Sequence, residues 1–144
     1  MTTRTTGGMT YNEFVKRPNR IRRRISHKIE DVMLKESICM RTTTTLGERV
    51  QTSPTNTQEV SYLRYIDAKN DLNDLAAELE TAQTEVRDFF YDNLSFDEAD
   101  LLEWRYIDGK SPQEIADKMG TTYEATRQRI KRANGKARRI YIRG

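Results

Sequence analysis

Apolar residues recur at helical intervals through two long stretches of the chain. The first stretch predicts a helix over residues 19–39, with Asn19 as its N-cap directly after Pro18. The apolar positions that repeat there are Ile21, Ile25, Ile29 and Val32. Residues 1–18 are expected to form a flexible tail, because the start of the chain shows no such period. The Thr-rich segment 41–58 predicts a linker.

The second stretch carries the longest periodic pattern. It predicts a helix over residues 58–92, roughly 52 Å long at 1.5 Å per residue. Its apolar positions alternate at intervals of three and four residues, as in the a/d seam of a coiled coil. They are Tyr65, Ala68, Leu72, Leu75, Leu79, Ala82, Val86 and Phe89. A helix of this length has to bury its seam. The partner is either the Ile21–Val32 stripe, as a hairpin, or the same helix of a second copy, giving a homodimer through the Leu72–Phe89 seam.

Three helix starts follow, each with a hydroxyl residue three positions before a Glu, which is the pattern of a capping box. The pairs are Ser95 and Glu98, Ser111 and Glu114, and Thr121 and Glu124. They predict helices at about 96–107, 112–119 and 122–140. No strand pattern is visible, so the predicted fold class is all-α. A helical hairpin over residues 19–92, with one long heptad-patterned helix, precedes a helix-turn-helix domain over residues 93–144.

The last two predicted helices are joined by a turn that is long enough only for a tight corner. Gly120 can adopt the positive φ that such a corner needs, and Ala116 is small where the two helices would cross. Two short helices joined in this way form a helix-turn-helix, whose second helix lies in the major groove of DNA. The Asn134-Gly135 pair favours a left-handed cap and is expected to interrupt this second helix.

The expected recognition helix divides into faces. The residues predicted to point inward are Thr126, Ile130, Ala133, Ala137 and Ile140. Arg127 and Lys131 belong to the exposed stripe beside them, and Thr122, Tyr123 and Gln128 lie toward the end that reaches base edges. Arg127 can pair with guanine and Gln128 with adenine, each through two hydrogen bonds. The remaining basic residues are placed to contact phosphates, and such contacts position a protein without reading the DNA sequence. They are Arg129, Arg132, Lys136, Arg138 and Arg139.

Charge is segregated along the chain, although 25 Lys and Arg against 22 Asp and Glu leave a net charge of only +3. Residues 16–28 and 127–143 hold many bases and no acid, whereas residues 57–103 are strongly acidic. Basic runs of this density favour a polyanion such as nucleic acid, because neutralised phosphates release counterions. The first basic run is expected either to contact phosphates or to dock on the acidic helix of its own chain.

Composition argues against most other classes within these 144 residues. A single cysteine, Cys39, excludes an internal disulfide and a cysteine zinc site, and His27 is the one histidine. There is no phosphate-binding glycine loop and no ligand spacing for a catalytic metal. We therefore expect no enzyme, no catalytic residues, no cofactor and no metal. No apolar run approaches the roughly 18 residues of a membrane helix, so a cytoplasmic protein is expected.

The stretch LLEWRYIDGKSPQEIADKMGTTYEATRQRIKRANGK, residues 101–136, resembles region 4 of the sigma-70-type RNA polymerase sigma factors. The matching features are a Leu-x-x-Arg-Tyr run before Gly109, then Glu114-Ile115-Ala116, Gly120 and the run from Arg127 to Ala133. In that family the second helix of the motif contacts the −35 promoter element. The resemblance implies that the base-proximal residues are Tyr123, Glu124, Arg127, Gln128 and Lys131. Thr121 and Thr126 depart from the family, which usually has aliphatic residues there, and nothing resembles region 2, so a complete sigma factor is not expected.

The layout, a helical first half before such a motif, also resembles short phage and prophage transcriptional regulators of Gram-positive bacteria. It implies a sequence-specific DNA-binding regulator that acts at promoter DNA, with host RNA polymerase as a further partner, in the cytoplasm or nucleoid of a bacterial host. Two other classes stay open. One is an interaction protein that binds and inhibits a host machine, and the other is a DNA-packaging protein similar to a terminase small subunit. The DNA target, the sign of regulation and the oligomeric state are left open.

Overall fold

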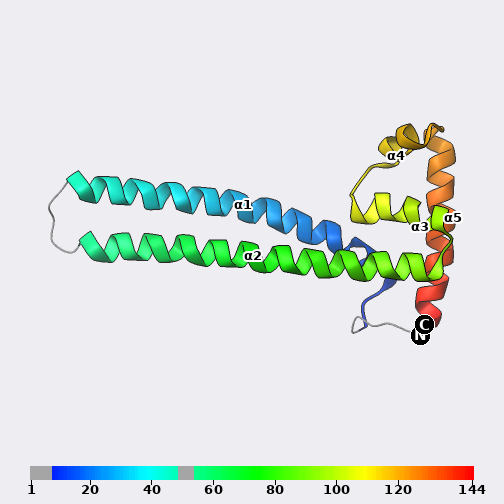
Figure 1. Cartoon of the computed structure of the whole chain (residues 1–144), viewed down its shortest axis with the longest axis horizontal. Helices are drawn as coiled ribbons and strands as arrows, with labels where there is room; N and C mark the ends of the chain where they lie inside the picture. The colour runs from blue at the N-terminus through cyan, green and yellow to red at the C-terminus, as the bar shows by residue number, and fades with distance from the viewer. Residues whose placement is uncertain (1–7, 49–53) are drawn as a thin grey trace. The chain divides into compact units, whose positions relative to one another are not determined.

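The structure is a computed structural model that describes residues 8–48 and 54–144, with side chains for residues 8–41 and 57–144. Every regular element in these residues is helical, which confirms the all-α prediction. In chain order they are α1 (Tyr11–Glu48), α2 (Pro54–Asn93), α3 (Phe96–Leu102), the π-helical turn η1 (Glu103–Ile107), α4 (Pro112–Met119) and α5 (Tyr123–Arg143) (Figure 1). The chain forms two compact units. One comprises the chain up to Arg20 together with Glu80–Gly144, and the other comprises Ile21–Leu79.

The first helix is much longer than its sequence pattern predicts. It begins at Tyr11 and continues to Glu48, so Pro18 and Asn19 lie inside α1 rather than at its start. A proline inside a helix removes one backbone hydrogen bond. Here Pro18 is fully buried, and so are Val15 and, at 4% exposed, Phe14 in the turn before it, so this packing outweighs the lost bond. The expected tail is therefore wrong from Tyr11 onward.

The predicted linker also shrinks, because α1 ends at Glu48 and α2 begins at Pro54. Residues 1–7 and 49–53, on which parts of the tail and linker predictions fall, lie outside the described residues. The long helix predicted for residues 58–92 is confirmed as α2. The domain boundary expected at residue 93 differs from the observed division, because both the start of α1 and the end of α2 belong to the unit that holds α3 to α5.

The Ile21–Leu79 unit is an antiparallel hairpin of α1 and α2 (Figure 1). The Tyr65 hydroxyl donates to Glu36 at 3.3 Å, and the Lys28 ammonium lies 3.4 Å from Asp71. The seam residues of α2 in this unit are buried or half-buried, and their neighbours are exposed except for the half-buried Ile66, as the heptad pattern largely predicts. The seam is thus covered within one chain, and the homodimer stays a prediction.

The stripe predicted on α1 is wrong at Ile29, which is 43% exposed. Lys28 is half-buried in its place, and its ammonium contacts both Asp31 and Asp71. The inward register is therefore Ile21, Ile25, Lys28 and Val32. An ion pair between the two helices takes the place that an apolar contact was expected to fill.

The other unit is built around a single apolar core. Its largest fully buried side chains include Phe90 of α2, Leu102 of α3, Ile107 of η1 and Ile115 of α4. Four aromatic rings close one side of this core, and they are Tyr11, Phe14, Phe89 and Tyr141. The first turns of α1 are thereby packed against the last turns of α5.

Capping explains where the short helices begin. Ser95 and Ser111 each form the predicted capping box, with Glu98 and Glu114 as their partners. The third predicted box is wrong by one residue. Thr122, not Thr121, is the N-cap of α5, and its hydroxyl accepts a hydrogen bond from the Ala125 N–H at 3.1 Å. The helix predicted for residues 96–107 is confirmed only in part, because its last five residues form η1.

Acid is expected to weaken the starts of α3 and α4. The Ser95 backbone N–H, together with Lys136, holds the pKa of Glu98 below its ordinary range. The Ser111 backbone N–H and hydroxyl lower the pKa of Glu114. A carboxylate with a depressed folded pKa stabilises the fold above about pH 4.3, and this contribution is lost as the pH falls through the folded pKa.

The measurement is the urea unfolding midpoint between about pH 7 and pH 3. The double variant Glu98→Gln, Glu114→Gln is expected to start lower at neutral pH and to lose less stability on acidification than the wild type. A fall in midpoint as large in the variant as in the wild type would contradict the assignment.

Candidate nucleic-acid interface

The corner between α4 and α5 has the geometry of a helix-turn-helix. Gly120 ends α4 in the left-handed conformation, at φ 68° and ψ 36°. Its N–H donates to the carbonyl of Asp117, and the next N–H, of Thr121, donates to the carbonyl of Ala116. Ala116 is fully buried, as expected for a small residue where two helices cross. The positive φ predicted for Gly120 is therefore confirmed.

One face of α5 is buried against the rest of its unit. The predicted inward residues Thr126, Ile130, Ala133 and Ala137 are buried, and Ile140 is half-buried. The break expected at Asn134-Gly135 does not occur, because α5 runs through both residues to Arg143. Asn134 instead accepts a hydrogen bond from Tyr11 and donates one to Tyr106, which fixes it inside the helix.

The six residues expected nearest the bases are all exposed, on the first half of α5 and its cap. They are Thr122, Tyr123, Glu124, Arg127, Gln128 and Lys131. Glu124 organises this surface, since its carboxylate accepts from Arg127 at 3.2 Å and from Gln128 at 3.5 Å. In the described part of the chain, Lys131 has no carboxylate within ion-pairing distance.

The residues expected to contact phosphate divide into two groups. Arg129 and Arg132 are exposed, and they line an open cleft of about 530 Å³ that Asp97 and Asp100 also line. Lys136 lies on the same side of α5, and its ammonium is 3.1 Å from the Glu98 carboxylate. Arg129, Arg132 and Lys136 therefore face the acidic start of α3.

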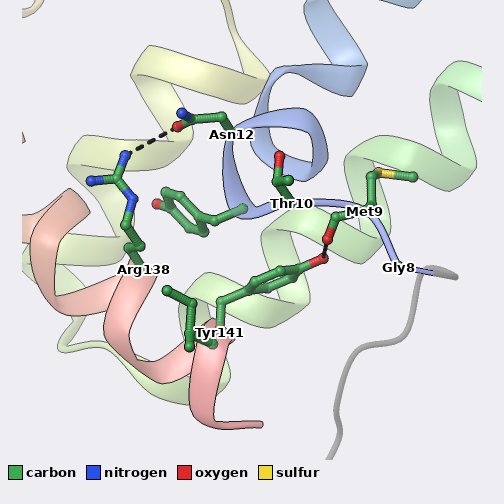
Figure 2. Close-up of a pocket in the computed structure, with 8 residues that line it drawn as sticks. Gly8, Met9, Thr10, Asn12, Arg138 and Tyr141 are labelled. Carbon is green, nitrogen blue, oxygen red and sulfur yellow. Dashed lines mark hydrogen bonds between the residues drawn. The ribbon is translucent and has the colours of Figure 1, made fainter.

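Arg138 and Arg139 lie further along α5. Arg138 donates to the Asn12 side chain of α1 at 3.1 Å and stacks over the Tyr11 ring, with 5.5 Å to its centroid (Figure 2). Near it, the Tyr141 hydroxyl donates to the Met9 carbonyl at 2.7 Å (Figure 2). Arg139 is exposed. The contact with Asn12 was not expected from the sequence, and it brings the start of α1 to the edge of the expected recognition surface.

A partly buried chain of polar side chains secures this junction. The Tyr11 hydroxyl donates to Asn134 at 2.7 Å, and the Asn134 amide donates to the Tyr106 hydroxyl at 2.8 Å. Burial raises the pKa of Tyr11 well above its usual value, so the phenol stays protonated as the hydrogen-bond donor. Tyr11, Tyr106 and Asn134 are therefore supporting residues that sequence reasoning missed.

A second polar cluster ties α2 to η1. The Tyr91 hydroxyl contacts Asp100 and lies 2.7 Å from Glu103, whose other oxygen accepts from Arg87 at 2.9 Å. Desolvation, with the two neighbouring carboxylates, raises the pKa of Tyr91. These bonds hold the start of the π-helical turn, which leads the chain into α4.

Among residues 8–48 and 54–144, no three His, Cys, Asp or Glu side chains gather in a way that would hold a metal ion. None of the helices in these ranges is long and apolar enough to cross a membrane.

Replacing Thr126 with valine is expected to stabilise the protein. Thr126 is fully buried, and among the described residues its hydroxyl has no hydrogen-bond partner. Valine has nearly the same shape without the hydroxyl, so we expect the free energy of unfolding to rise by about 1 kcal/mol. Thermal unfolding followed by circular dichroism measures this gain.

Thr122→Val is the matched control, because the same change there removes the N-cap bond of α5. It is expected to lower the unfolding free energy by about 1 kcal/mol. A Thr126→Val variant that is less stable than the wild type would mean that the hydroxyl has a stabilising partner.

The comparisons with known proteins bear on this unit alone. No curated protein and no solved structure matches the chain. One family model matches, that of sigma-70, region 4, and it covers residues 92–139, from the end of α2 well into α5. This range contains the stretch 101–136 that resembles region 4, so the resemblance is confirmed. The part of the chain from the end of α2 into α5, with its helix-turn-helix corner, is similar to region 4 of the sigma-70 family.

Proposed function

We propose that this chain is a sequence-specific transcriptional regulator that places α5 in the major groove of promoter DNA and acts there with host RNA polymerase. The observation that carries the proposal is the two-sided character of α5. One side is buried behind the helix-turn-helix corner, and the other presents Arg127, Gln128 and Lys131 to solvent. The match of residues 92–139 to sigma-70 region 4 supports the same placement.

Glu124 prepares this surface for base recognition. By holding the ends of Arg127 and Gln128, its carboxylate limits the rotamers that both side chains would otherwise sample. On DNA, Arg127 can turn to guanine and Gln128 to adenine, while the released carboxylate can accept from cytosine. These three residues would thus read neighbouring base pairs.

The basic residues on the other side of α5 would position the duplex by contacting its phosphates. Arg129, Arg132 and Arg139 are exposed and, in the described residues, have no ion pair. Lys136 shares its charge with Glu98 and would contribute less. Contacts of this kind raise the affinity for every sequence alike.

The test is a selection of bound duplexes from a random DNA library by the full chain at about 150 mM salt, where non-specific binding is weakened. The wild type is compared with Arg127→Ala, Lys131→Ala and with a control, Arg129→Ala, Arg132→Ala. Both double variants remove the same charge from the same helix. The wild type is expected to enrich one motif, the first variant to lose it, and the control to keep it with lower affinity.

Two outcomes would contradict the proposal. No enriched motif for the folded wild type would exclude sequence-specific reading and favour the interaction protein. A motif that survives in the Arg127→Ala, Lys131→Ala variant would show that another surface reads the DNA. Binding of the wild type to host RNA polymerase in a pull-down, with and without the selected duplex, tests the polymerase part separately.

A further inference from the structure

The first turn of α1 lies against the second half of the recognition helix. Arg138 donates to Asn12 (Figure 2). Tyr11 is hydrogen-bonded to Asn134, which lies one turn before Arg138 on α5. Asn134 and Arg138 follow Arg127 and Lys131 along one stripe of α5, at intervals of three and four residues; Asn134 is half-buried and the other three are exposed. The start of α1 is therefore fixed beside the stripe that faces the DNA in the proposed complex.

From this junction a line of polar and basic residues continues along α1. Asn12, Lys16 and Arg20 follow at intervals of four residues, so they share one face of the helix, and all three are exposed or half-exposed. In the described chain, Lys16 and Arg20 have no carboxylate partner. Arg17 differs, because it points to another face and pairs with Glu85 at 2.8 Å. Within the described residues, Lys16 and Arg20 therefore continue, as unpaired cations, the face of α1 on which Asn12 contacts Arg138.

The length of α5 between Arg127 and Arg138 places Arg138, and the polar and basic residues of α1 next to it, at the edge of the major groove. Arg138 follows Arg127 by eleven residues, which is about 16 Å along the helix at 1.5 Å per residue. The major groove is about 12 Å wide. When Arg127 touches a base edge, Arg138 therefore lies beyond the groove, at the height of a phosphate strand. The residues that continue from Arg138 along α1 face the same strand.

We propose that Lys16 and Arg20 form a second phosphate-binding line, which the Asn12–Arg138 contact holds beside α5. This line would bind the part of the duplex that extends beyond the helix-turn-helix. This inference rests on the proposed function, since it takes the orientation of the DNA from α5. The two residues are positioning residues. They add affinity for any sequence and fix the register in which α5 meets the bases.

The test is the salt dependence of binding to the selected duplex and to a scrambled one, measured by fluorescence anisotropy with the full chain. Lys16→Gln, Arg20→Gln is compared with Arg17→Gln, Arg87→Gln, which removes the same charge from two ion-paired residues. In the first variant the negative slope of log K against log salt is expected to become shallower by about 1.8, since each phosphate contact contributes about −0.9. Affinity for both duplexes is expected to fall about tenfold near 150 mM salt.

The motif selected from the random library is expected to stay the same in this variant, and the control is expected to keep the wild-type slope. Equal slopes in wild type and Lys16→Gln, Arg20→Gln would overturn the inference while leaving the proposed function intact. If the slope of the control became shallower by the same amount, the effect would come from the net charge alone, and the inference would also be overturned. Loss of the motif in the wild type, in contrast, would be a failure of the proposed function. Circular dichroism of each variant confirms that it is folded.

Discussion

Replacing Phe14 with alanine is expected to lower the free energy of unfolding by about 3–5 kcal/mol, the range for removing a packed phenylalanine. Phe14 is only 4% exposed. Its ring centroid lies 5.7 Å from that of Phe89 on α2 and 5.2 Å from that of Tyr141 on α5. The cavity would therefore open where three helices meet. Urea unfolding followed by circular dichroism measures the loss.

The matched control is Phe96→Ala, which removes the same side chain from a position that is 77% exposed. Its effect is expected to stay within about 0.5 kcal/mol. We also expect Phe14→Ala to weaken DNA binding, because it loosens the start of α1 from α5. If Phe14→Ala were as stable as Phe96→Ala, the first turn of α1 would not belong to the core.

Replacing Ala116 with leucine is expected to abolish sequence-specific DNA binding and to cost about 1–3 kcal/mol of stability through overpacking. Ala116 is fully buried in α4 beside the corner that leads into α5. Three added carbon atoms have no room there unless α4 moves away from α5. That movement would change the angle at which the recognition helix is presented, so binding should suffer more than stability.

The measurements are thermal unfolding and binding to the selected duplex at a temperature where the variant is fully folded. Gln113→Leu is the control, because it introduces the same residue on the exposed side of α4. It is expected to keep the motif and nearly all of the stability. Wild-type binding by a folded Ala116→Leu variant would show that the α4–α5 angle is not critical for recognition.

The corner and the faces of α5 could be predicted because their signals are local. Gly120 and the Ser111 capping box each act over a few residues, and the inward period of α5 is set by helix geometry alone. The same holds for the seam of α2, whose members are buried or half-buried. Where two adjacent residues can play the same role, the sequence does not show which of them does so, and the prediction can be wrong by one residue. Thr121 and Thr122 are both hydroxyl residues, and Thr122 caps α5.

The start of α1 was missed although its signal is present. Tyr11, Phe14, Val15 and Pro18 follow the i, i+3, i+4, i+7 pattern of a buried helix face, and all four are buried. Pro18 suggested a helix boundary because a proline usually ends the pattern that precedes it. Tertiary packing overrides that local cost here. The partner that decides the matter, Tyr141, is far away in the sequence, where no local pattern reveals it.

The internal partners of the expected phosphate-binding residues also could not be predicted from the sequence. Lys136 is paired with Glu98, and Arg138 is bonded to Asn12 across 126 positions of sequence. A run of basic residues without acidic residues shows only that positive charge is concentrated in that part of the sequence. Which of those bases stay free depends on the helices that pack beside them, and that information is tertiary.

The contact between the start of α1 and the end of α5 also has a consequence for the order of folding. The bonds from Tyr11 to Asn134 and from Tyr141 to Met9 join residues 123 and 132 positions apart. Closing loops of this length carries an entropic cost that only the finished core repays, and such non-local contacts slow folding. During translation, Tyr11 and Phe14 are made long before the segment they pack against. Until Asn134 and Tyr141 have left the ribosome, Tyr11 and Phe14 lack their native partners on α5, and α5 lacks its final support.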